Sequence, residues 1–109
     1  MQVRPLDIER LFSSAALYAT LAVFFDYPDD TFYPRLISRL TGTDIKSVLR
    51  ELAKLKEIGI LDGGPGGRGN EYRLNTDFPL YGELLAIFAK TRKSRRYRQP
   101  LSPFVDLFS

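Results

Sequence analysis

The longest uncharged run in this chain, "LFSSAALYATLAVFF" from Leu11 to Phe25, places apolar residues on nearly every side of a helical wheel. A helix with that pattern must be buried on more than one side. The run is shorter than the roughly 20 residues that a membrane-spanning helix needs. We therefore expect a central buried helix, capped at its start by Asp7 and stopped by Pro28.

Two arrangements would bury such a helix in a chain of 109 residues. Either all of its apolar residues enter one core, or one side faces the core and another side faces a second subunit. We favour the second arrangement, which predicts a homodimer built largely from the first and last helices. The expected interface residues are large and apolar: Phe12, Tyr18, Leu21, Phe25, Leu84 and Phe88.

The composition excludes several kinds of site, because the chain has no Cys, no His and no Trp. It can form neither a disulfide framework nor the usual thiolate or imidazole metal site. It also lacks the histidine that activates a Ser or Cys nucleophile. We expect no catalytic site, no metal and no cofactor. The N-terminal segment "MQVRPLDIERLF" carries acids and no signal-peptide pattern, so we expect a cytoplasmic protein.

A pair of helices joined by a tight turn should follow the central helix. The first, residues 34–40, starts with a proline and comes after a short β-like stretch at 31–33. Gly42 forms the turn, and Asp44 caps the second helix, residues 45–58. The second helix should bury one stripe at helical spacing, formed by Val48, Leu52, Leu55 and Ile58. Its other side is predominantly basic.

A hairpin and a last helix complete the expected domain. Strands at 60–62 and 71–74 flank the glycine-rich loop "GGPGGRGN". The last helix begins near Pro79, and its apolar face consists of Leu80, Leu84, Leu85, Ile87 and Phe88. We find no internal linker, and we expect one domain over 1–93 followed by a basic and apolar tail over 94–109.

A short helix, a glycine turn and a basic second helix make a helix-turn-helix, whose second helix fits the DNA major groove. A hairpin directly after it can lie along the adjacent backbone and place Arg68 in the minor groove. The glycines around Arg68 would let the backbone approach DNA closely. The predicted order is helix, short strand, helix, helix, strand, strand, helix. That order is a winged helix-turn-helix, a mainly α fold with a small β-hairpin wing (α+β).

An ordered set of residues between about positions 8 and 92 also matches a known pattern. The matching residues are Leu11, Phe12, Ser13, Thr31, Phe32, Tyr33, Arg39, Leu40, Gly42, Val48, Arg50, Glu51, Leu52, Gly59, Leu61, Tyr72, Arg73, Leu74, Asn75, Asp77, Pro79, Leu80, Glu83, Leu84, Ile87 and Phe88. The set resembles ArsR-like winged-helix transcriptional regulators. It is similar in particular to a bacterial and archaeal group related to winged-helix proteins that are sometimes fused to nucleotidyltransferase domains.

The resemblance implies a sequence-specific, homodimeric transcriptional regulator whose partner is double-stranded DNA. Carried onto this chain, it implies DNA contacts from the second helix of the pair and from the hairpin: Lys46, Ser47, Leu49, Arg50, Lys54, Arg68, Asn70 and Arg73. Metal-sensing members use clusters of Cys and His, which this chain lacks, so we do not extend metal sensing to it.

Three features leave alternatives open. Leu49 either touches a thymine methyl group or packs inward. The run "KTRKSRRYR" at 90–98 has six basic residues and no acid, and it either contacts phosphates, through Arg95 and Arg96 for example, or is a solvated tail. The apolar end of the tail suits docking either on its own dimer or on a protein partner. Because residues 1–89 hold twelve acids against ten bases, the alternative function is a winged-helix protein–protein interaction module without DNA binding.

Overall fold

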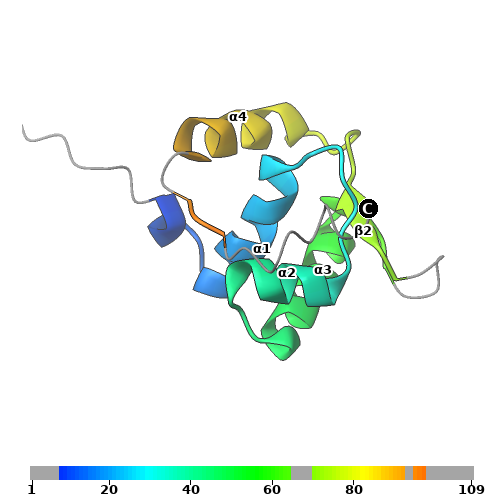
Figure 1. Cartoon of the computed structure of the whole chain (residues 1–109). Coiled ribbons are helices and arrows are strands. Elements are labelled where there is room, and N and C mark those ends of the chain that lie inside the picture. The colour runs from blue at the N-terminus through cyan, green and yellow to red at the C-terminus, as the bar shows by residue number, and fades with distance from the viewer. Residues whose placement is uncertain (1–7, 65–69, 93–94, 98–109) are drawn as a thin grey trace, which may run out of the picture.

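Helix α1 lies at the centre of the structure, which is a computed structural model that describes residues 8–64, 70–92 and 95–97 (Figure 1). The elements in chain order are a 3₁₀ helix η1 (Ile8–Leu11), α1 (Ala15–Asp26), α2 (Pro34–Thr41), α3 (Ile45–Ile58), β1 (Leu61–Gly63), β2 (Tyr72–Leu74) and α4 (Tyr81–Thr91). Helix α4 packs on one side of α1, and α2 and α3 pack on the other. The described part of the chain is therefore mainly helical with a small antiparallel hairpin, as expected.

Helix α1 begins later than the sequence suggested. Its N-cap is Ser14, whose hydroxyl accepts a hydrogen bond from the Leu17 backbone N–H at 3.0 Å. The expected cap, Asp7, lies outside the described residues, and Leu11 is 79% exposed in the preceding 3₁₀ turn. The predicted helical start was wrong because the Ser14 side chain satisfies a free N–H and starts a new helix there. The helix ends at Asp26, two residues before Pro28 as expected.

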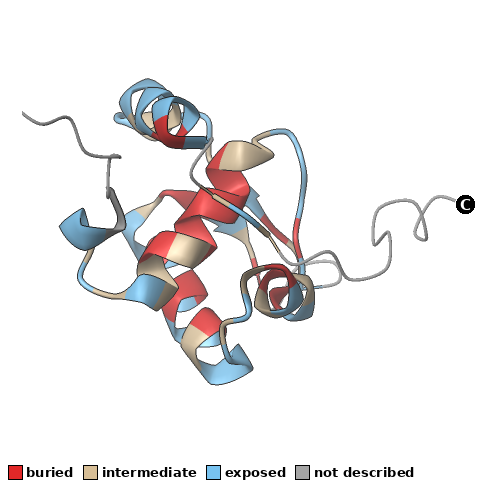
Figure 2. Ribbon diagram, turned by 60° about the vertical axis from the view of Figure 1, so that its left-hand side comes forward, coloured by how far each residue is buried: buried red, intermediate tan, exposed pale blue. Residues whose placement is uncertain are grey.

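The central helix enters a single core within one chain (Figure 2). Phe88 of α4 is fully buried at its middle and stacks on Phe25 with ring centroids 5.2 Å apart. Tyr18 and Phe12 also contact the Phe88 ring. Of the residues that we expected at a dimer interface, Tyr18, Leu21, Phe25 and Phe88 are buried in this core, and Phe12 and Leu84 are half-buried against it. Packing within one chain already covers the first four side chains, so they are not available to a partner, and the assignment of Phe12 and Leu84 stays a prediction.

Helix α4 instead leaves other apolar residues in solvent. Leu80, which caps it, is 54% exposed and Ile87 is 41% exposed, although both were expected on its buried face. The reason is that α4 packs against α1, so only one side of the helix is covered.

The turn between α2 and α3 is held by local hydrogen bonds. Gly42 has φ 72° and donates its N–H to the Ser38 carbonyl at 2.9 Å, which ends α2 in a left-handed cap. The Ser38 hydroxyl donates to the Thr43 carbonyl at 2.6 Å. Asp44 then caps α3 by accepting a hydrogen bond from the Ser47 N–H at 3.0 Å. Helix α3 consequently spans the predicted residues.

The hairpin is joined to the loop between α1 and α2. Strand β1 pairs with β2 in the register Leu61 to Leu74, Asp62 to Arg73 and Gly63 to Tyr72. Phe32 forms an isolated antiparallel bridge to Tyr72, with N–H···O distances of 2.8 and 2.9 Å. The short β-like stretch expected at 31–33 thus pairs through its middle residue, and it connects the loop end of the hairpin strands to the start of α2.

Residues 95–97 pack back onto the helical domain, beyond position 93 where we expected it to end. The Arg95 guanidinium forms a two-pronged ion pair with the Asp26 carboxylate, in which Nε donates at 2.6 Å. Their side chains are only 6% and 1% exposed. The Tyr97 hydroxyl donates to the same carboxylate. We call residues 95–97 the C-terminal strap.

Candidate functional site

Helices α2 and α3 and the turn between them expose far more positive than negative charge. Six basic side chains are exposed between positions 34 and 58, namely Arg35, Arg39, Lys46, Arg50, Lys54 and Lys56. The exposed acids in the same stretch are Asp44 and Glu57. Because the third acid of the stretch, Glu51, is buried, the surface of this helix pair is more basic than its sequence suggests.

The residues predicted to read DNA from α3 lie mostly on its exposed side. Lys46, Arg50 and Lys54 are all exposed, and the Arg50 and Lys54 side chains retain 66% and 46% of their accessible surface. Leu49 is 44% exposed, so it does not pack inward. These residues project away from the stripe that faces α1 and α2.

Ser47 was predicted to contact DNA, and it also takes part in the N-cap of α3. Its hydroxyl donates to Asp44 Oδ1 at 2.8 Å, and its backbone N–H donates to Oδ2. The same hydroxyl lies 3.4 Å from Arg50 Nη2, which donates to it. The hydrogen bonds from Ser47 lower the pKa of Asp44 below its ordinary value. The cap therefore links the first turn of α3 to the side chain that we expected to contact bases.

The buried stripe of α3 differs from the predicted one at two positions. Val48, Leu52 and Leu55 are buried as expected, but Ile58 is 54% exposed. Gly59, at φ 101°, turns the chain directly after Ile58 and ends the helix there. Glu51, which sequence reasoning did not select, is 2% exposed on the same side of the helix. Its spacing of three residues from Val48 and four from Leu55 is the signal that would have placed it there.

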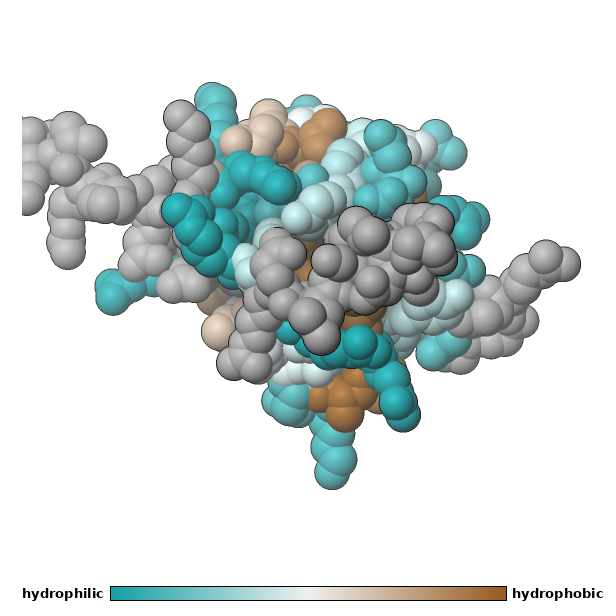
Figure 3. Space-filling view, in the orientation of Figure 1, coloured by the Kyte–Doolittle hydropathy of each residue, from teal (hydrophilic) through white to brown (hydrophobic). Residues whose placement is uncertain are grey.

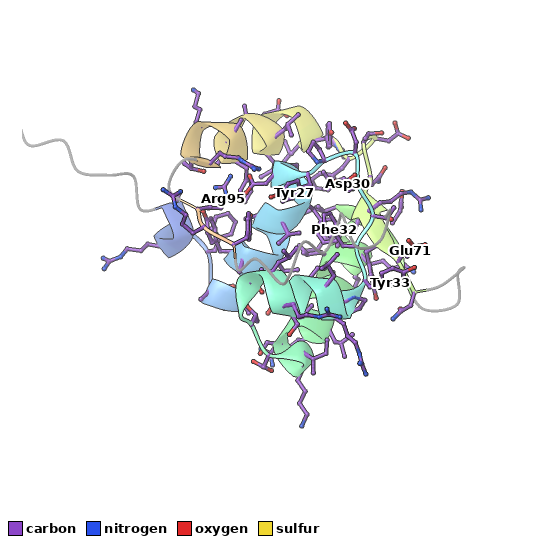
Figure 4. The ribbon with its side chains drawn as sticks, viewed as in Figure 1. Tyr27, Asp30, Phe32, Tyr33, Glu71 and Arg95 are labelled. Carbon is purple, nitrogen blue, oxygen red and sulfur yellow. The ribbon has the colours of Figure 1, made fainter. Side chains whose placement is uncertain are left out.

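The hairpin carries two of the three residues expected to contact DNA from the wing. Arg73 is exposed at the centre of β2. Asn70 is exposed and adopts φ 62°, a left-handed conformation that asparagine tolerates in turns. Arg68 lies outside the described residues. Thr31 donates to Glu71 at 3.1 Å, and Figure 4 shows Glu71 near Tyr33 on the hairpin side of the molecule.

Two glycines of the hairpin are required by its own geometry. Gly63 has φ 97°, and a Cβ there would lie 2.1 Å from the Glu71 carbonyl oxygen. Gly64 has φ 95°, and a Cβ there would lie 2.9 Å from the Tyr72 ring. We had explained the glycines around Arg68 by close approach to DNA, and those glycines lie outside the described residues. At Gly63 and Gly64, the close approach is to residues of the same hairpin.

The strap accounts for part of the basic run that we had considered for phosphate contact. Arg95 lies beside Tyr27 below α4 (Figure 4), and its guanidinium covers the Phe88 ring at 5.1 Å. Burial alone would lower the pKa of Arg95, but hydrogen bonds to Asp26 and Tyr18 raise it above its ordinary value. The Arg95 side chain is thus a charged group that is largely buried, with 6% of its surface exposed. Arg96, in contrast, is exposed.

Comparison of this chain with protein-family models, with curated proteins and with solved structures gives no match in any of the three. Among the described residues, no helix combines the length and the apolar character that crossing a membrane requires.

Proposed function

We propose that this chain is a winged helix-turn-helix transcriptional regulator that binds double-stranded DNA as a homodimer. In this proposal α3 enters the major groove, and the hairpin lies on the neighbouring backbone. The observation that carries the proposal is the exposed basic surface of the α2–α3 pair. A single helix fits the major groove, and basic side chains on its outer face are attracted to the flanking phosphates.

The arrangement of the elements supports the same conclusion. A left-handed glycine turn joins α2 to α3, and the hairpin follows α3 directly. The Phe32 bridge supplies a short third pairing at the loop end of the hairpin strands. For the homodimer, the support now includes the exposed Leu80 and Ile87 of α4, because four of the six residues we first chose are buried.

A protein-interaction module is the second candidate, and the same α4 surface favours it. Figure 3 shows hydrophobic atoms gathered over α4, next to hydrophilic ones. An exposed apolar surface of this kind also suits a different protein as its partner. Binding to DNA separates the two candidates.

The test is titration of the purified protein with a duplex selected from random sequences, at several salt concentrations. We expect binding that weakens steeply as salt rises, because phosphate contacts release counterions. Lys46→Ala, on the exposed face of α3, should weaken binding and reduce the salt slope by roughly one. Lys90→Ala removes the same charge from α4 and should change neither.

Sedimentation of the same samples measures the dimer. Absence of salt-dependent binding to any duplex, with an intact fold, would reject the DNA-binding proposal in favour of the interaction module. Equal effects of the two lysine substitutions would show that α3 is not the contacting helix.

A further inference from the structure

The buried acid of α3 lies between two of the basic residues that the proposed function assigns to DNA. Glu51 Oε1 is 3.0 Å from Lys54 Nζ, and Glu51 Oε2 is 3.7 Å from Arg50 Nε. The Glu51 side chain is 3% exposed, whereas both basic side chains extend into solvent. One carboxylate thus lies beside the Lys54 ammonium and the Nε side of the Arg50 guanidinium, on two side chains that are otherwise largely in solvent.

Glu51 is poorly suited to a purely stabilising role. Removing a carboxylate from water is costly unless good hydrogen bonds compensate for the loss. Lys54 is close enough for an ion pair, but among the described residues Glu51 Oε1 accepts no hydrogen bond with acceptable geometry. Arg50 is at the outer limit of an ion pair. A glutamine or an apolar residue of similar shape would fill this place at lower cost.

The carboxylate does, however, restrict how Arg50 can point. Its Nε is drawn toward Glu51, and its Nη2 lies 3.4 Å from the Ser47 hydroxyl, which the Asp44 cap holds in turn. Two separate contacts therefore act on one guanidinium from the same side. An arginine whose conformation is restricted before binding loses less entropy when it grips a base.

We propose that Glu51 is a positioning residue for DNA recognition. It holds Arg50 and Lys54 along α3 in the free protein, and its negative charge weakens their attraction to phosphates of any sequence. The inference rests on the proposed function. It adds to that function a role for Glu51. This acid does not touch DNA, but it contributes to the preference for one DNA sequence over others.

The first test needs no DNA. Nitrogen relaxation of the Arg50 Nε–H group reports how far that side chain is restrained on a fast timescale. We expect a restrained group in the wild type and a clearly more mobile one in Glu51→Gln, which keeps the shape and removes the charge. The matched control is Glu57→Gln, which removes an exposed acid from the same helix and should leave Arg50 unchanged. Equal mobility of Arg50 in the wild type and in Glu51→Gln would overturn the inference.

The second test compares the preferred duplex with a scrambled one. Glu51→Gln should bind the scrambled duplex more tightly, and the ratio of the two dissociation constants should fall by roughly three- to tenfold. Glu57→Gln should tighten both duplexes alike and keep the ratio. If Glu51→Gln also keeps the ratio, or weakens both duplexes equally, the inference fails.

A third variant tests the inference even if Glu51→Gln does not fold. Glu51→Asp keeps the charge but withdraws the carboxylate from both cations, so the ratio should fall without tighter binding to scrambled DNA. An unchanged ratio in Glu51→Asp would also overturn the inference. If the wild type binds no duplex, the proposed function fails, and the Arg50 relaxation still decides whether Glu51 restrains that side chain.

Discussion

Arg95 and Arg50 carry the same guanidinium group in opposite environments. Arg95 is 6% exposed and is paired with a carboxylate that is 1% exposed, in the half of the molecule built from α1, α4 and the strap. Arg50 is 66% exposed in the other half, built from α2, α3 and the hairpin. The first half keeps its ion pair inside, and the second presents its positive charge to solvent. A count of basic residues along the sequence therefore does not locate a nucleic-acid surface.

The largest expected effect comes from replacing Arg95, in the half built from α1, α4 and the strap. Arg95→Ala removes the two-pronged partner of the buried Asp26 carboxylate and leaves it the Tyr97 hydroxyl and the more distant Arg92. The free energy of unfolding should fall by about 3–5 kcal/mol. Chemical denaturation measures the change. The affinity of the remaining folded protein for DNA should stay the same, because the Arg95 side chain is largely buried.

Two controls sharpen that comparison. Lys90→Ala removes an exposed charge from α4 and should change the free energy of unfolding by less than about 0.5 kcal/mol. Arg50→Ala should cost little stability, because Lys54 still faces Glu51, but it should weaken binding to the preferred duplex by about 1–3 kcal/mol. If Arg95→Ala weakened DNA binding as Arg50→Ala does, the division into two halves would be wrong.

A smaller effect is expected where an apolar residue lies on the basic face. If the half-exposed Leu49 contacts a thymine methyl group, replacing that thymine with uracil removes only the methyl and should weaken binding by about 0.8 kcal/mol, or roughly fourfold. In Leu49→Ala the same replacement should have no effect. Leu80→Ala, which shortens an exposed leucine on α4, should remain sensitive to it. A Leu49→Ala protein that still distinguishes thymine from uracil would show that the contact is made elsewhere.

The smallest effect is the loss of folding stability at low pH through the Asp44 cap of α3. The pKa of Asp44 is below its ordinary value of 3.8, chiefly because Ser47 donates hydrogen bonds to the carboxylate. The folded state therefore favours the ionised form, so its stabilisation is complete above pH 3.8 and is lost as the pH falls through the lowered pKa. The loss should be slight because Asp44 is exposed.

Thermal melting across that pH range, compared with Asp44→Asn, isolates this contribution. Asparagine can still accept a hydrogen bond at the N-cap but does not titrate, so its melting temperature should depend less on pH than that of the wild type. An identical pH dependence in both proteins would mean that the Asp44 carboxylate does not contribute.

The local parts of the fold were predictable, and the contacts between distant residues were not. The bounds of α3 follow from Asp44, Gly59 and an apolar stripe, all of which act within a few residues. The Ser14 cap was missed because Asp7 offers an equally good local signal. Asp26 and Arg95 are 69 positions apart, and no local pattern indicates that they pair.

In the candidate site, too, some features could be predicted from local patterns and others could not. The exposure of Lys46 and Arg50 followed from their places on the helical wheel. The burial of Glu51 could be deduced from its spacing, but an acid is an unusual core residue, and the prediction placed Ile58 in the stripe instead. Four of the predicted dimer residues are buried within the chain, because a helix that is apolar on several sides can be covered by its own chain as well as by a partner.

The Phe32–Tyr72 bridge has a mechanical consequence for the proposed complex. Tyr33 directly follows the bridged Phe32 and is the N-cap of α2, which packs in turn against α3. The loop end of the paired strands and the helix proposed to enter DNA are therefore connected through this bridge and α2. If that connection holds their separation in the complex, the duplex adapts to the protein. Sequences whose groove width already matches that separation, or which deform easily to reach it, would then be preferred at positions that no side chain touches.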